Sequence, residues 1–130
     1  MNKPALRVLV ALLPFLLLPV LASSQSLKEV VGTWEGESKC TVIPSPCHDE
    51  HVIYEITQEG HSNKLSISAD KVVEGERINM GTLPCSYHSP KLECTYRDSL
   101  WTFVIKDKEM AGKLTRADGT VYRKITAHKK

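Results

Sequence analysis

The sequence has no apolar run long enough to span a membrane. Its longest apolar stretch, Val8–Ala22, has about 15 residues, whereas a membrane-spanning helix needs roughly 20. Pro14 and Pro19 interrupt the stretch, and proline breaks a helix because it lacks a backbone N–H donor. We therefore interpret the stretch as the apolar region of an export signal and not as an uncleaved membrane anchor.

An excess of basic residues is also missing from most of the chain. The formal net charge is +2, from 17 lysines and arginines against 15 aspartates and glutamates. Lys3 and Arg7 account for the excess, so residues 23–130 are close to neutral. A nucleic-acid-binding protein is expected to present a basic face, and only the terminal pair Lys129–Lys130 is clustered. The composition therefore argues against nucleic acid as a partner.

The N-terminus has the order of features that is typical of a signal peptide. The two basic residues precede the apolar stretch, and cleavage can follow Ala22 or, alternatively, Ser24. No cysteine lies near either position, which argues against a lipid-anchored lipoprotein. We predict a signal peptide over residues 1–22, a single domain over residues 23–130, and a secreted or periplasmic location.

Alternation of apolar and polar residues runs through nearly all of the predicted mature chain. This period of two is typical of strands with one buried face, and helical periodicity is confined to one capped turn at 26–31. The alternation slips near Gly81, which indicates a β-bulge. The predicted strands are 32–43, 51–58, 65–73, 76–87, 92–96, 101–105, 110–114 and 121–125.

Eight short strands joined by tight turns favour an antiparallel meander. Such a meander buries its single apolar face and removes its edges by closing on itself. A two-sheet sandwich is the alternative, but it usually needs longer crossing connections. We predict an all-β fold, an eight-stranded antiparallel up-and-down barrel.

Four cysteines in the predicted mature chain suit an oxidising compartment and suggest two disulfides. If Ser89–Pro90 is a hairpin tip, Cys85 and Cys94 lie directly opposite each other on neighbouring strands. Cys40 and Cys47 bracket a short segment that contains two prolines. We expect these local pairs, because pairing between the two sets would have to cross the barrel.

The segment Leu27–Trp34 resembles the start of the lipocalin-like (calycin) barrels, in which a short helical turn precedes Gly-x-Trp, here Gly32 and Trp34. In those families the tryptophan closes one barrel end and an arginine of the last strand lies across it. The resemblance implies that Arg123, on the inward phase, stacks on Trp34. The chain is shorter than typical lipocalins and lacks their long helix, so a large cavity is not implied. Residues 45–50 also resemble small secreted bacterial proteins of unassigned function.

Enzyme motifs are absent: there is no Gly-x-Ser-x-Gly elbow, no phosphate-binding glycine loop and no His-Glu-x-x-His helix. Glu35, Glu37, Glu55 and Glu93 fall on outward phases, and Ser38 faces inward without a histidine on its face. No interior pair of carboxylates is therefore expected for acid–base work. We predict a protein that is not an enzyme and needs no cofactor.

The densest polar cluster is His48–His51, in the loop before the second predicted strand. Two imidazoles with a carboxylate are a possible metal-ligand set. The spacing matches no standard template, however, and Cys47 is expected in a disulfide. The alternative is a solvated loop in which Asp49 or Glu50 bonds the turn backbone.

The barrel interior is the remaining candidate site. An eight-stranded barrel is just wide enough to be filled by side chains or to hold one small ligand. A ligand would enter at the end that holds the turns at 44–50, 74–75, 98–99 and 116–119; the alternative is a packed core. The candidate ligand-binding residues are Tyr54, Met80, Tyr96, Trp101, Phe103 and Met110.

Three functions remain in order of preference. The first is a non-enzymatic exported binding protein, monomeric, with a small apolar ligand. The second is a secreted protein-binding barrel such as a protease inhibitor, since small bacterial metalloprotease inhibitors resemble this chain in size, barrel type and a Ser-Ser start, here Ser23–Ser24. The third is a metal-binding protein that uses His48 and His51.

Overall fold

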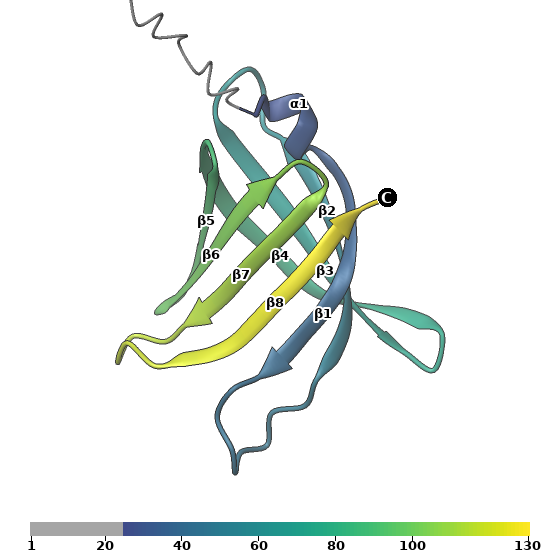
Figure 1. Ribbon diagram of the computed structural model, residues 1–130, viewed down its shortest axis with the longest axis vertical. Helices are drawn as coiled ribbons and strands as arrows, with labels where there is room; N and C mark the ends of the chain where they lie inside the picture. Colours follow the sequence, from purple (N-terminus) through teal and green to yellow (C-terminus); the bar gives the residue numbers. More distant parts are fainter. Residues whose placement is uncertain (1–24) are drawn as a thin grey trace, which may run out of the picture.

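The computed structural model describes residues 25–130, so the predicted signal peptide and both cleavage positions lie outside the described residues. The eight strands follow one another around a closed antiparallel barrel, each paired with its neighbours in sequence (Figure 1). The predicted fold class is therefore confirmed. The elements are α1 (Leu27–Val30), β1 (Gly32–Cys40), β2 (Glu50–Gln58), β3 (Lys64–Val73), β4 (Glu76–His88), β5 (Lys91–Tyr96), β6 (Ser99–Lys106), β7 (Glu109–Thr115) and β8 (Val121–Lys129).

The core follows the alternation of the sequence. In β2, for example, Val52, Tyr54 and Ile56 are buried while the residues between them are partly exposed, because successive side chains of a strand point to opposite faces. No helix among residues 25–130 is long and apolar enough to cross a membrane. The buried side chains include Trp34, Tyr54, Ile67, Leu83, Leu92, Phe103, Met110 and Ile125.

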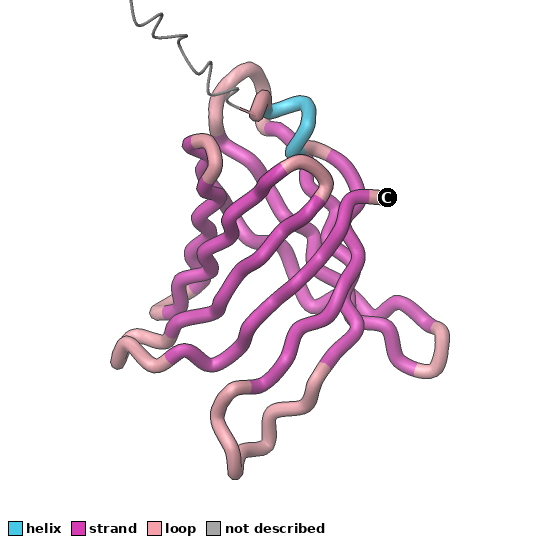
Figure 2. The backbone as a smooth tube through the Cα atoms, in the orientation of Figure 1, coloured by secondary structure: helices cyan, strands magenta, loops and turns pink. Residues whose placement is uncertain are grey.

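The short helix α1 covers one end of the barrel (Figures 1 and 2). The Glu29 side chain accepts a hydrogen bond from the backbone N–H of Ser26 at 2.7 Å, which supports the first turn. At the end of the helix, Val30 and Trp34 are fully buried. The Trp34 Nε1–H donates to the Val30 carbonyl at 2.8 Å, so the large ring is held under the helix with its polar atom satisfied.

Closure of the barrel depends on a close approach between β1 and β8. Gly36 lies opposite Ala127 in this pair, and a Cβ on Gly36 would lie only 1.9 Å from the Thr126 carbonyl oxygen. Only glycine therefore fits at this position. The requirement is steric and does not come from an unusual backbone angle.

The β3–β4 hairpin extends beyond the barrel wall (Figures 1 and 2). Its register shifts between Ala69 and Asp70, so that Met80 is left without a partner, in agreement with the predicted bulge near Gly81. The Asp70 carboxylate accepts hydrogen bonds from Asn79 Nδ2 and Arg77 Nε, each at 2.7 Å. These two bonds, of which the Asn79 bond has the larger effect, lower the pKa of Asp70. They also stabilise the bulge.

Both disulfide bonds are present as predicted. Cys40 is bonded to Cys47, and Cys85 is bonded to Cys94. Cys85 and Cys94 are direct partners in the β4–β5 ladder. The first strand ends at Cys40, three residues earlier than expected; the chain then turns outward, and Ile43 is exposed.

The implied stacking of Arg123 on Trp34 is wrong. The β1–β8 register pairs Trp34 with Lys129 and places Arg123 opposite Cys40, about 20 Å further along the strand. Lys129 takes the position beside the closed end, where its Nζ donates to the Glu29 carbonyl at 2.7 Å. Arg123 instead belongs to the opposite end of the barrel.

Gly36→Ala should lower the free energy of unfolding by about 2 kcal/mol or more, because the added methyl group meets backbone atoms that cannot move without opening the closing pair. Urea denaturation followed by circular dichroism measures the change. Lys39→Ala, an exposed position on the same strand, is the control and should change stability by less than about 0.5 kcal/mol. Equal effects of the two substitutions would contradict the steric requirement.

Candidate functional site

A cavity of about 290 Å³ lies inside the barrel at the end opposite α1. We call this end, which is formed by the loop 41–49 and the turns 97–98 and 116–120, the mouth. Every strand of the barrel contributes at least one lining residue, so the cavity is part of the barrel interior. The lining residues are Ser38, Glu50, Val52, Tyr54, Ala69, Met80, Gly81, Thr82, Leu83, Tyr96, Trp101, Leu114 and Arg123.

Most of the cavity wall is apolar. Trp101 lies on one side and stacks on Phe103, with ring centroids 6.4 Å apart and planes at 16°. The Phe103 ring in turn meets Tyr54 edge to face at 6.0 Å. Tyr54 and Trp101 line the cavity, and Phe103 packs against both of them from the core.

The predicted ligand-binding residues are distributed between the cavity and the core. Tyr54 and Trp101 line the cavity wall, whereas Met80 and Tyr96 line it at partly exposed positions, with 44% and 51% of their surface accessible. Phe103 lies in the core below, at 1% exposure. Met110, at 2% exposure, also belongs to this core. Alternation identifies which side chains point inward, but it does not give their depth along the barrel axis.

One side of the cavity is polar, and we call its residues Ser38, Glu50, Tyr54 and Arg123 the polar corner. Arg123 Nη1 donates to the Ser38 carbonyl at 3.4 Å, to Ser38 Oγ at 3.3 Å and to the His48 carbonyl at 3.0 Å. The same nitrogen lies 3.5 Å from Glu50 Oε2. Arg123 therefore ties β1, the loop 41–49 and β8 together at the mouth.

Tyr54 places a hydroxyl at the polar corner from the middle of β2. Only 2% of the residue is exposed, and this burial raises the pKa of the Tyr54 hydroxyl above its usual value. The phenol consequently stays protonated at neutral pH. The Tyr54 hydroxyl forms no hydrogen bond within residues 25–130. Every fully enclosed side-chain oxygen in these residues has a hydrogen-bond partner. The hydroxyl oxygen therefore retains some surface, which faces the cavity that Tyr54 lines.

The cluster at 48–51 does not assemble as a metal site. The His51 ring lies on the outer surface, where its Nε2 is 2.8 Å from Glu35 and its Nδ1 is 3.0 Å from Glu37. Asp49 Oδ1 accepts a hydrogen bond from the Cys40 backbone N–H at 2.8 Å, as the solvated-loop alternative predicts. Within residues 25–130 there is no group of three or more histidine, cysteine or acidic side chains placed to hold a metal.

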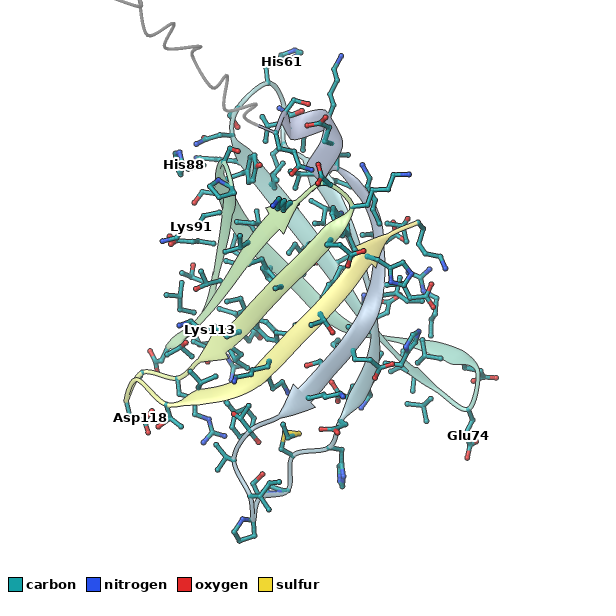
Figure 3. All side chains as sticks on the ribbon, viewed as in Figure 1. His61, Glu74, His88, Lys91, Lys113 and Asp118 are labelled. Atoms are coloured by element: carbon teal, nitrogen blue, oxygen red, sulfur yellow. A yellow bond between two sulfur atoms is a disulfide. The ribbon has the colours of Figure 1, made fainter. Side chains whose placement is uncertain are left out.

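Other polar residues lie away from the mouth. His61 and His88 are at the α1 end (Figure 3). Glu74 marks the tip of the β3–β4 hairpin, which projects to the side of the barrel (Figure 3), so the predicted turn 74–75 is not at the mouth. A larger hollow of about 570 Å³ also lies at the α1 end, and its lining includes turn residues such as Pro90, Asp107 and Lys108.

Part of the site does not follow from the sequence pattern. Alternation predicts that Arg123 and Ser38 point inward, but it does not assign them to a binding site. The sequence places Glu50 with the loop, whereas in the structure it is the first residue of β2 and its side chain is only 20% exposed. Its period-two relation to Val52 and Tyr54 is the signal that could have placed it in the cavity.

Comparisons with known proteins add little. No protein-family model matches the chain, and no curated protein matches it. Among solved structures, zebrafish ileal bile acid-binding protein complexed with cholic acid matches 78% of this chain and 99% of that chain, with 19% identity and a TM-score of 0.47. A likeness at this level identifies neither the family nor the ligand of this chain.

Arg123→Ala should lower the free energy of unfolding by about 2 kcal/mol or more, because Glu50 and the Ser38 and His48 carbonyls lose their shared partner in a largely buried setting. Urea denaturation measures the loss. Lys124→Ala, the exposed neighbour on β8, should cost less than about 0.5 kcal/mol. A loss within error of zero for Arg123→Ala would show that these contacts do not stabilise the fold.

The outer ion pairs of His51 should make stability depend on pH. Hydrogen bonds to Glu37, and to a smaller extent to Glu35, raise the pKa of His51. A hydrogen bond from Lys130, with a smaller contribution from His51, lowers the pKa of Glu35 to about 2. The His51 contribution is therefore complete below the unfolded-state pKa of about 6.5 and is lost as pH rises through the higher folded-state value.

Thermal melts of wild type and His51→Gln at about pH 5 and about pH 9 test this dependence. The wild type should have the advantage only at the lower pH, and the advantage should be small because exposed ion pairs contribute little. His61→Gln, which removes a loop histidine that pairs with no carboxylate in residues 25–130, is the control. An advantage that grows toward high pH would refute the assignment.

Proposed function

We propose that this protein is a non-enzymatic, exported binding protein that holds a small apolar ligand in the cavity at the mouth of the barrel. The observation that carries the proposal is the cavity itself, to which all eight strands contribute. One end of the barrel is filled by Trp34 and covered by α1, so the mouth is the way in. Ligand sites in proteins are typically concave, mostly apolar and furnished with a few polar groups.

The volume and the lining limit the ligand. At about 290 Å³, the cavity is at the small end of known ligand sites, which begin near 300 Å³. Trp101 and Tyr54 offer flat aromatic surfaces, while Leu83 and Leu114 offer aliphatic contact. The ligand in this proposal is therefore a short, largely apolar molecule with few polar atoms.

Export belongs to the proposal as well. The two disulfides suit an oxidising compartment outside the cytoplasm. The basic residues and the apolar stretch within residues 1–22 are the expected export signal. With no pair of carboxylates among the cavity residues of the described chain, the proposed role is binding rather than catalysis.

A second candidate is a protein-binding barrel, favoured by the projecting β3–β4 hairpin. Beyond the barrel wall this hairpin exposes Val73 and Ile78, each with more than 40% of its surface accessible. A protease inhibitor could use such a projection to contact its target. Binding of a protein partner that Ile78→Ser abolishes, without any ligand in the cavity, would favour this alternative.

Ala69→Phe should weaken ligand binding, because a phenyl ring at position 69 fills the space that Ala69 now lines. Titration with a neutral naphthylamine dye, whose fluorescence rises in apolar surroundings, measures the effect, which should be at least about tenfold in Kd. The melting temperature of the variant should equal that of the wild type, because the phenyl ring enters the empty space of the cavity.

Ala111→Phe is the matched control, because Ala111 is exposed on the outside of β7. Dye binding should be unchanged in this variant. Wild-type protein that does not bind the dye, or binding that survives Ala69→Phe, would contradict the cavity as the site.

A further inference from the structure

The polar corner contains hydrogen-bonding groups that the protein itself leaves unused. All the hydrogen bonds and the ion pair of the Arg123 guanidinium within residues 25–130 are made by Nη1, and its Cζ lies 6.0 Å from the centroid of the Tyr122 ring. Arginine carries five N–H donors, so Nε and Nη2 retain three. Only 12% of the side chain is exposed, and Arg123 lines the cavity. None of the fully enclosed side-chain nitrogens in residues 25–130 lacks a partner, so these free donors retain some surface and are open to an acceptor from outside the chain.

Glu50 leaves acceptors unused at the same place. Its carboxylate takes part in no hydrogen bond within residues 25–130 and makes only two charge contacts, 3.5 Å to Arg123 and 4.0 Å to Lys71. Its side chain is 20% exposed. A carboxylate oxygen accepts and does not donate, so Glu50 calls for a donor. The neighbouring Tyr54 hydroxyl, also without a partner in the described chain, can serve either role.

The charges of the corner are compensated inside the protein. Arg123 and Glu50 are a pair of opposite sign within 3.5 Å. Lys71 does not line the cavity, and 36% of its side chain is accessible to water, which screens its charge. An anionic head group would enter beside Glu50 and be repelled, while a cationic one would enter beside Arg123. A head group of either charge would lose its hydration on entering the cavity, and the polar corner offers no net opposite charge to compensate for that loss.

We propose that the ligand has a short apolar body that ends in an uncharged group able both to accept and to donate hydrogen bonds, a hydroxyl or a carboxamide. Its oxygen accepts from Arg123, and its O–H or N–H donates to Glu50 at the mouth. The apolar body lies against Trp101, Leu83 and Leu114 further inside. This assignment rests on the proposed binding function and adds the chemistry of the head group.

Four ligands with the same chain and different head groups test the assignment: octanamide, octanol, octanoate and octylammonium. Binding to the full protein is followed by calorimetry and by tryptophan fluorescence, to which Trp34 and Trp101 both contribute and in which Trp101 lines the cavity. Octanamide and octanol should each bind at least about tenfold more tightly than octanoate and octylammonium. This comparison uses wild-type protein alone, so it does not depend on whether a variant folds.

Glu50→Gln then tests the role of the carboxylate. The substitution leaves Arg123 uncompensated, so octanoate should gain affinity and the preference for octanamide over octanoate should be lost or reversed. Lys71→Gln, which removes the solvent-exposed charge on the other side of Glu50, should leave the preference unchanged.

The outcomes separate the two proposals. If the naphthylamine dye binds in the cavity but octanoate binds as tightly as octanamide, the head-group assignment fails and the binding function stands. A preference that Glu50→Gln leaves untouched also overturns the assignment. If neither the dye nor any of the four ligands binds, both proposals fail together.

Discussion

The antiparallel register of β1 against β8 closes the barrel and determines which side chains meet inside it. The register brings Gly36 against Ala127 so closely that no side chain fits at position 36. It also separates Trp34 from Arg123 by six positions along the paired strands. The α1 end of the barrel therefore holds the indole ring, and the mouth holds the guanidinium group. A shift by one residue would turn the apolar face of β8 outward, because side chains alternate along a strand. This pairing therefore places Trp34 at the closed end and Arg123 at the mouth, and the β1–β2 pairing adds Glu50 opposite Ser38.

The two ends of the barrel are filled in different ways. At the α1 end, Trp34 occupies the interior and donates its only polar hydrogen to Val30, which leaves an apolar plug without unmet hydrogen bonds. At the mouth, Arg123 and Glu50 enter the interior as a pair, and this lowers the cost of burying either charge alone. The cavity lies between these two arrangements because neither the aromatic core nor the ion pair fills the space beside Ala69. The cavity is thus the consequence of two different ways of filling one barrel.

The β3–β4 hairpin affects the same cavity from the side. β4 pairs with β5 only over Cys85–His88, and the bulge opposite Ala69 and Asp70 turns its first half away from the barrel. Met80 and Tyr96 therefore lie at the edge of the cavity with much of their surface accessible. The disulfide Cys85–Cys94 joins the two strands at the last point where they still pair.

The sequence by itself determined the strands, their meander order, the bulge and both disulfide pairs, because alternation, turn residues and hairpin symmetry are local signals. It also marked Tyr54, Trp101 and Arg123 as inward. Only the tertiary structure decided depth and partners: Phe103 and Met110 are core, Glu50 belongs to the interior, and Arg123 pairs with Glu50 rather than Trp34. Depth along a barrel depends on how far each strand is displaced against its neighbour. That displacement accumulates around all eight strands, and no single segment of the sequence contains it.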